Sequence, residues 1–228
     1  MTSDARTALA WLAGDLALIV ASVVVYATSP SSIIQVKPTF LQDLFFIDYD
    51  ANVSNWYSSL QLAFVGVVWL RIARVARAGR TPDRRLATAA LLIFGAAMFG
   101  SLDEVAQVHE KIGVYTQDPL LPRTGYWIFI YLPVLFALAL AVLALIGRRL
   151  WANRRALTWI VIGGALYLVS AGGLEIILNF IPSGGVAELI ELHVEESGEL
   201  IGVWMILWGS LLLGETLVPG AAVSGGGE

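Results

Sequence analysis

The chain has 228 residues, of which 57% are hydrophobic and 14% are charged, and its mean hydropathy is +0.75. Soluble domains are about half apolar and about a quarter charged, so this composition excludes an ordinary soluble domain and predicts an integral membrane protein. The formal net charge of -4 says little about partners, because acidic and basic residues lie in different parts of the chain. The absence of cysteine excludes disulfides, thiolate metal sites, iron–sulfur clusters and cysteine nucleophiles.

Six apolar stretches are each long enough to cross a bilayer, which takes about 20 helical residues. They are residues 8–27, 57–73, 86–108, 126–146, 157–181 and 186–213. The first lacks the short apolar core and small-residue cleavage site of a signal peptide, so we expect it to be retained as a span. The sequence thus predicts an all-α, polytopic bundle of about six transmembrane helices in residues 1–217. A disordered tail is expected over residues 218–228.

Arginine predicts the orientation of this bundle. Eleven of the 14 basic residues would lie on one side of six spans: Arg6, Arg71, Arg74, Arg77, Arg80, Arg84, Arg85, Arg148, Arg149, Arg154 and Arg155. The other side holds Lys37, Lys111 and Arg123. By the positive-inside rule both termini are expected in the cytoplasm. We interpret the basic loops as topology signals and expect no nucleic-acid partner.

Acidic residues of three spans are expected at one depth, in the outer leaflet. Asp103 lies roughly 10 Å below the outer end of the third span, at 1.5 Å per residue, and Glu104, His109 and Glu110 follow it. Glu175 lies about two turns below the outer end of the fifth span. The sixth span descends through carboxylates on one helical stripe, with Glu196 at its flank: Glu188, Glu191, Glu195 and Glu199. Asp103, Gln107 and Glu110 are expected to form a similar stripe on the third span.

These carboxylates require compensation, because one charged acid near the membrane centre costs about 2.5 to 3.5 kcal/mol. The basic residues on that side are too few to pair with them. The acids could instead hold protons, or bind a divalent cation such as Fe, Mn, Zn, Ca or Mg. The sequence favours the metal, because histidine and carboxylates share the cluster. The expected ligands are Asp103, Glu104, His109, Glu110, Glu175, Glu195, Glu196 and Glu199.

Other polar residues have simpler explanations. Glu188 and Glu191 could be solvated acids in the first turn of a helix, where negative charge is favourable. His193 lies about 140° from the acidic stripe of its helix, which favours a packing role over a ligand role. His109 could be a ligand or a capping group. Asp15 is expected nearer the inner leaflet and separate from the cluster.

Several motifs resemble a family of uncharacterised bacterial multi-pass membrane proteins. They are Asp48-Tyr-Asp50-Ala-Asn52 with Trp56-Tyr57-Ser58-Ser59, Leu102-Asp103-Glu104 with His109-Glu110, the lone Glu175, and Glu195-Glu196-Ser-Gly-Glu199. The resemblance covers most of the chain and implies that these groups act together, without implying an activity. The Asp48-x-Asp50-x-Asn52 run also resembles the start of a calcium loop, but Val53 stands where an EF-hand needs glycine and Ser59 where it needs glutamate.

Three functions remain open from the sequence. A metal-dependent membrane enzyme would act on a lipid or lipid-like substrate, with Glu104 or Glu196 as general base. It would not be a symmetric di-iron bundle, because the chain lacks the Glu-x-x-His motif and offers only the reversed His193-x-x-Glu196. A proton-coupled cation transporter or channel would need an inner half-path, for which Asp15 and Ser210 are the obvious polar groups. An accessory or structural subunit would use the acids to bind a partner.

Overall fold

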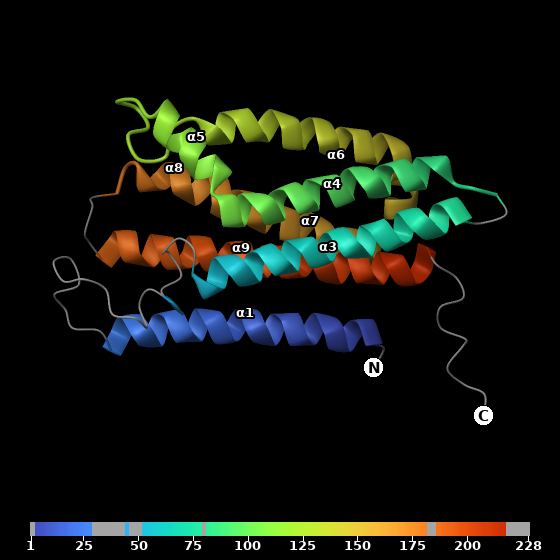
Figure 1. The fold of residues 1–228 in the computed structure, drawn as a ribbon, viewed down its shortest axis with the longest axis horizontal. Helices are drawn as coiled ribbons and strands as arrows, with labels where there is room; N and C mark the ends of the chain where they lie inside the picture. The colour runs from blue at the N-terminus through green and yellow to red at the C-terminus, as the bar shows by residue number, and fades with distance from the viewer. Residues whose placement is uncertain (1–2, 29–43, 46–51, 79–80, 182–185, 218–228) are drawn as a thin grey trace.

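The structure, a computed structural model, describes residues 3–28, 44–45, 52–78, 81–181 and 186–217 (Figure 1). The regular elements of these residues are all helices, and the described part of the chain contains no β-strand. Six helical stretches are long and apolar enough to cross a membrane, which confirms the predicted polytopic helical bundle. The elements are α1 (Ser3–Thr28), α3 (Val53–Ala78), α4 (Arg84–Ala106), α5 (Val108–Thr116), α6 (Trp127–Ala152), α7 (Arg154–Leu168), η1 (Val169–Leu174), α8 (Glu175–Leu178) and α9 (Val186–Leu217).

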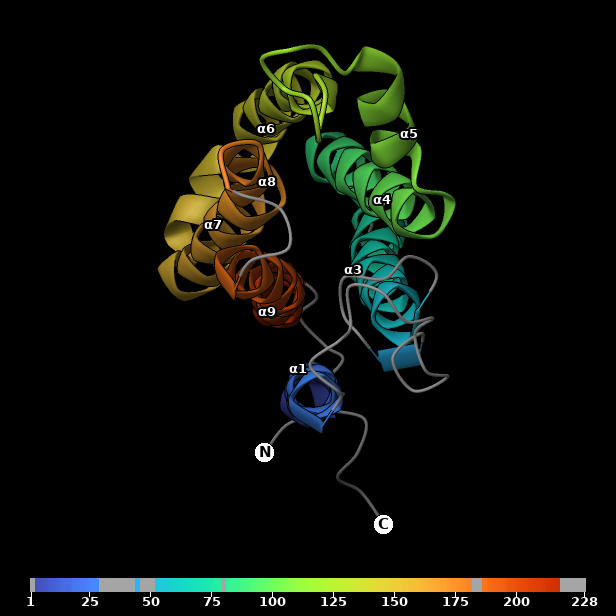
Figure 2. The same ribbon diagram turned by 90° about the vertical axis from the view of Figure 1, so that its left-hand side faces the viewer.

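The long helices run side by side, so each end of the bundle collects a different set of residues. Arginines of α3, α4, α6 and α7 gather at the end where α1 begins and α9 ends, and we call it the arginine end (Figure 1). The opposite end carries α5 and α8, and we call it the acidic end. Seen from the acidic end, α3, α4 and α5 face α7, α8 and α9, with α6 closing one side and α1 the other (Figure 2).

The core lies where α3 packs against α4 and α9, and where α7 packs against α9. Trp69, Ile72, Val203 and Leu207 are almost completely buried there. Gly202 allows α9 to approach α7 closely, because a Cβ at this position would lie 2.9 Å from the carbonyl oxygen of Gly163. By contrast, large apolar side chains of α1 and α6 are exposed, as expected for helices that face lipid.

At the arginine end, Asp83 caps the N-terminus of α4. The carboxylate of Asp83 accepts a hydrogen bond of 3.0 Å from the backbone N–H of Leu86, the usual arrangement of an N-cap. The same carboxylate pairs with Arg149 at the end of α6. The Leu86 N–H and the Arg149 charge hold the pKa of Asp83 below its usual range. The cap therefore ties α4 to α6.

Two predicted spans are interrupted near the acidic end. The third does not continue as one helix, because Gln107 adopts a left-handed conformation with φ of 53° and separates α4 from α5. The expected stripe of Asp103, Gln107 and Glu110 on one helix is therefore wrong. The fifth span contains the π-helical turn η1, which includes Gly172 and Gly173. The extra residue of a π turn rotates the rest of the span by about 100° relative to an ideal helix.

Some predictions lie outside the described residues. They are the disordered tail over 218–228, the basic residue Lys37 and the aspartates of the Asp48-x-Asp50 run.

Candidate carboxylate and histidine site

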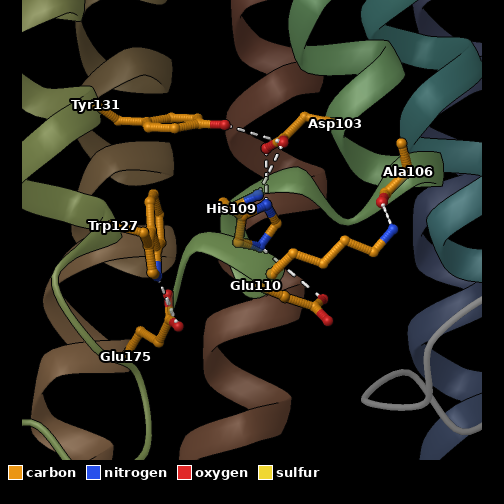
Figure 3. A network of polar contacts seen from close by, with 8 residues as sticks. Asp103, Ala106, His109, Glu110, Trp127, Tyr131 and Glu175 are labelled. Carbon is orange, nitrogen blue, oxygen red and sulfur yellow. Dashed lines mark hydrogen bonds and ion pairs between the residues drawn. The ribbon is translucent and has the colours of Figure 1, made fainter. Parts of the chain in front are cut away.

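His109 and Asp103 contact each other directly at the acidic end (Figure 3). Because the chain turns at Gln107, the start of α5 folds back toward the end of α4. The backbone N–H of His109 donates to Oδ1 of Asp103 at 3.1 Å, and its Nδ1 lies 2.7 Å from Oδ2. The hydroxyl of Tyr131 on α6 also donates to Oδ1, at 3.2 Å. Asp103 therefore fixes the orientation of the imidazole.

The other nitrogen of His109 faces more carboxylates. Its Nε2 lies 4.0 Å from Oε1 of Glu110. Burial lowers the pKa of His109, but its hydrogen bond to Asp103 and the charges of Asp103, Glu175 and Glu110 outweigh this effect. The pKa of His109 is therefore raised above its ordinary value.

The aromatic side chains of α6 hold this group in place. The rings of His109 and Trp127 are 4.9 Å apart between centroids, and Trp127 packs edge-on against Tyr131. The indole N–H of Trp127 donates to Oε1 of Glu175 on α8 at 2.9 Å (Figure 3). Trp127 thus connects the histidine of α5 to the carboxylate of α8.

Gly125 makes the close approach of α5 to α6 feasible. It has a φ of +65°, and a Cβ there would lie 2.1 Å from the carbonyl oxygen of Gly113 on α5. Only glycine fits such a contact in this backbone conformation. Without it α5 could not lie against the start of α6, where Trp127 meets His109.

The acids of α9 belong to the same electrostatic neighbourhood. Glu195 interacts with Glu191, Glu175 and Glu196. Glu199 interacts with Glu104 of α4 and with the acids around it on α9. Tyr167 of α7 lies within the electrostatic reach of Glu104, Glu199, Asp103 and Glu196. Acids of the third, fifth and sixth spans are thus within electrostatic range of one another.

Basic side chains do not neutralise this cluster within the described residues. Arg123 pairs with Glu188 and donates to the carbonyl oxygen of Leu178. The ammonium group of Lys111 donates to the carbonyl oxygen of Ala106. In the part of the chain that the structure describes, neither of these two cations forms an ion pair with the deeper acids.

The acids and histidines are not arranged as a finished metal site. Among the described residues, no three of these side chains stand at distances that would hold a metal ion. Both oxygens of Glu191 are buried, and they have no hydrogen-bond partner in that part of the chain. The carboxyl of Glu195, one turn along α9, is an electrostatic neighbour of Glu191.

The remaining polar residues mostly have structural roles. His193 has its Nδ1 2.9 Å from the carbonyl oxygen of Leu189 and its Nε2 3.2 Å from the hydroxyl of Ser22, which agrees with the predicted packing role. Glu188 is not simply a solvated first-turn acid, since it pairs with Arg123. Asp15 lies in the middle of α1, fully buried, and not toward the inner end as expected.

Sequence reasoning missed Trp127, Tyr131 and Tyr167. Their donors are common in membrane helices, and their importance follows only from the packing of α6 and α7 against the acids. The spacing of Trp127 and Tyr131, four residues apart on one helical face, was the available signal.

The family model described as Domain of unknown function (DUF8692) matches residues 15–213, so the chain belongs to this family. The match includes every residue of the site described above. No curated protein and no solved structure matches the chain.

Proposed function

We propose that this membrane protein of the DUF8692 family binds a divalent cation at its acidic end, next to His109. The observation that carries the proposal is the orientation of His109 by Asp103. A metal-bound histidine typically donates its second ring N–H to a carboxylate, which fixes the tautomer and the ring. His109 has such a partner at 2.7 Å, and its Nε2 faces Glu110.

The first ligands in this proposal are Nε2 of His109 and the carboxylates of Glu110 and Glu175. Two ligands each about 2.1 Å from one ion lie about 3 Å apart. The 4.0 Å between Nε2 and Glu110 can therefore close by rotation of the glutamate side chain. Glu104, Glu195, Glu196 and Glu199 complete the predicted ligand set. Asp103 supports the site from behind the histidine.

The chemistry proposed for this site is metal-assisted catalysis. A bound Fe, Mn, Zn, Ca or Mg ion would act on a lipid-like substrate, because Glu104, Glu175 and the acids of α9 lie within candidate membrane spans. Glu104 or Glu196 would serve as the general base.

The proposal places the acidic end in the outer leaflet of a bacterial cytoplasmic membrane. The arginines at the opposite end, together with the positive-inside rule, support this orientation. Reporter fusions after Arg85 and Arg155 are expected to report the cytoplasm, and a fusion after Asp118 the outside. The reverse pattern would move the site to the inner leaflet.

Thermal unfolding of the purified protein tests the metal. Chelation is expected to lower the Tm, and one particular metal should restore it, because a ligand that binds only the folded state stabilises it by about 2.7 kcal/mol at 100 times its Kd. His109→Gln and Glu175→Gln should abolish this recovery. Asp103→Asn should weaken binding by about 10- to 100-fold without abolishing it. Glu215→Gln, at the arginine end, is the matched control.

A second candidate follows from Glu191. Its two buried oxygens have no hydrogen-bond partner among the described residues, and Glu195 is an electrostatic neighbour. Neighbouring carboxyls without a cation are stable when they share a proton. In that case the cluster would serve a proton-coupled transporter. The protein would then be indifferent to chelators, and Glu195→Gln would be neutral or stabilising.

A further inference from the structure

One face of α3 carries buried polar atoms that have no hydrogen-bond partner within the described residues. Ser54, Ser58 and Gln61 are each more than nine-tenths buried and follow a spacing of four and three residues, which aligns them along one helical face. Within the described residues, Ser54 Oγ, Ser58 Oγ and Gln61 Oε1 have no hydrogen-bond partner. The three atoms span about 10 Å of helix, from the acidic end toward the middle of the membrane.

This face connects the acid cluster to Asp15. The hydroxyl of Ser58 interacts with the carboxyl of Glu104 but does not reach ordinary hydrogen-bond geometry. One turn deeper, Nε2 of Gln61 donates to both oxygens of Asp15, at 3.3 and 3.1 Å. The polar face therefore begins at the proposed cation site and ends at a carboxyl in the middle of α1.

Groups of α3 and α9 also lie near the level of Asp15. On α3, Tyr57 interacts with Asp15 and donates its hydroxyl to the carbonyl oxygen of Trp11. On α9, the contacts of His193 with Ser22 and of Trp204 with Ala8 place Glu199 at about the level of Asp15.

Below Asp15 the same face of α3 becomes apolar. Val65, Trp69 and Ile72 continue the spacing, and each is at most 3% exposed. The indole N–H of Trp69 is satisfied by the hydroxyl of Ser210 at 2.9 Å. This half of the face offers no unpartnered side-chain atom within the described residues.

We propose that water enters from the acidic end along Ser54, Ser58 and Gln61 and makes Asp15 a proton-exchange site open to that side only. Buried polar groups without protein partners are usually satisfied by internal water. Such water gives the Asp15 carboxylate a route by which it takes up one proton, which the outer solution replaces. The apolar half of α3 closes the route toward the arginine end. Proton exchange at Asp15 does not depend on whether a metal occupies the outer cluster.

Infrared difference spectroscopy on the full chain in liposomes tests this inference, with a chelator present and the orientation set by reporter labelling. Acidifying the solution at the acidic end should produce the C=O band of a protonated carboxyl that Asp15→Asn abolishes. Acidifying the other side alone should not. Ser58→Val should slow the appearance of the band by about tenfold, since a buried hydration site is lost.

Ser58→Thr is the matched control, because threonine has the shape of valine and keeps the hydroxyl. It should retain the wild-type rate, while equal Tm values for the two variants show that both fold. Three results would overturn the inference: a band that responds to the arginine end, equal rates in the valine and threonine variants, or no Asp15-dependent band at any external pH.

Discussion

The two halves of the bundle bury different kinds of side chain along α3: polar in one half and apolar in the other. Toward the acidic end, α3 presents Ser54, Ser58 and Gln61, and toward the arginine end it presents Val65, Trp69 and Ile72. The acidic half holds carboxylates from four elements, whereas the arginine half is packed like an apolar core. A membrane protein can bury many acids only where cations, protons or water compensate them. The contrast therefore predicts that the proposed cation site and the entry of water are confined to the acidic half.

The largest expected effect comes from opening the apolar half. Trp69→Ala removes a side chain that is 2% exposed and leaves Ser210 without its indole partner. Truncating a buried tryptophan costs about 3–5 kcal/mol, which should appear as a large loss of Tm in detergent. Trp56→Ala is the control, because Trp56 is 59% exposed and should cost little. Equal losses of Tm in the two variants would contradict close packing in the arginine half.

Two acids on successive turns of α9 should respond with opposite signs in metal-free protein. Glu188→Gln removes the ion pair with Arg123 and should destabilise by about 1 kcal/mol. Glu191→Gln should raise the free energy of unfolding by about 1 kcal/mol. In the wild type two neighbouring carboxyls face each other, whereas the amide of the variant can donate a hydrogen bond to Glu195. Chemical denaturation with chelator present measures both. A loss of stability in Glu191→Gln would mean that its carboxylate already has a favourable partner.

The geometry of the acidic half depends on a helix break at Gln107 that hydrophobic periodicity does not predict. The six spans follow from composition, and the gathering of arginines at one end of the bundle follows from their positions in the chain. The left-handed Gln107 does not, because this conformation is rare outside glycine and nothing local demands it. It is this turn that brings His109 back onto Asp103. Likewise, the position of Asp15 relative to the acids of α9 depends on how α1 packs against α9. The sequence of α1 alone does not determine this packing.

His109 should make the stability of the metal-free protein depend on pH. Because the folded-state pKa of His109 is raised, its stabilising contribution is complete below the ordinary value of 6.5 and is lost as the pH rises through the raised pKa. The difference in the free energy of unfolding between wild type and His109→Gln should therefore be largest at acidic pH and should shrink as the pH rises. In an Asp103→Asn background the pH dependence should shrink, since Asp103 is the main group raising this pKa.

The smallest effect is expected at the arginine end, far from the acids. Asp83→Ala should cost about 1 kcal/mol, because it removes the cap of α4 and the pair with Arg149. Asp83→Asn keeps a capping oxygen and should cost less. Neither should alter the response to chelator or metal. A change in metal response would show that the two halves are coupled.

The most direct measurement is elemental analysis of the purified protein, paired with the same analysis of His109→Gln and Glu175→Gln. A cation site at the acidic end predicts one metal bound near stoichiometrically in the wild type and lost in both variants, with Glu215→Gln unchanged. A wild-type protein that carries no metal and is unaffected by chelators would contradict the cation site and leave the acids to hold protons.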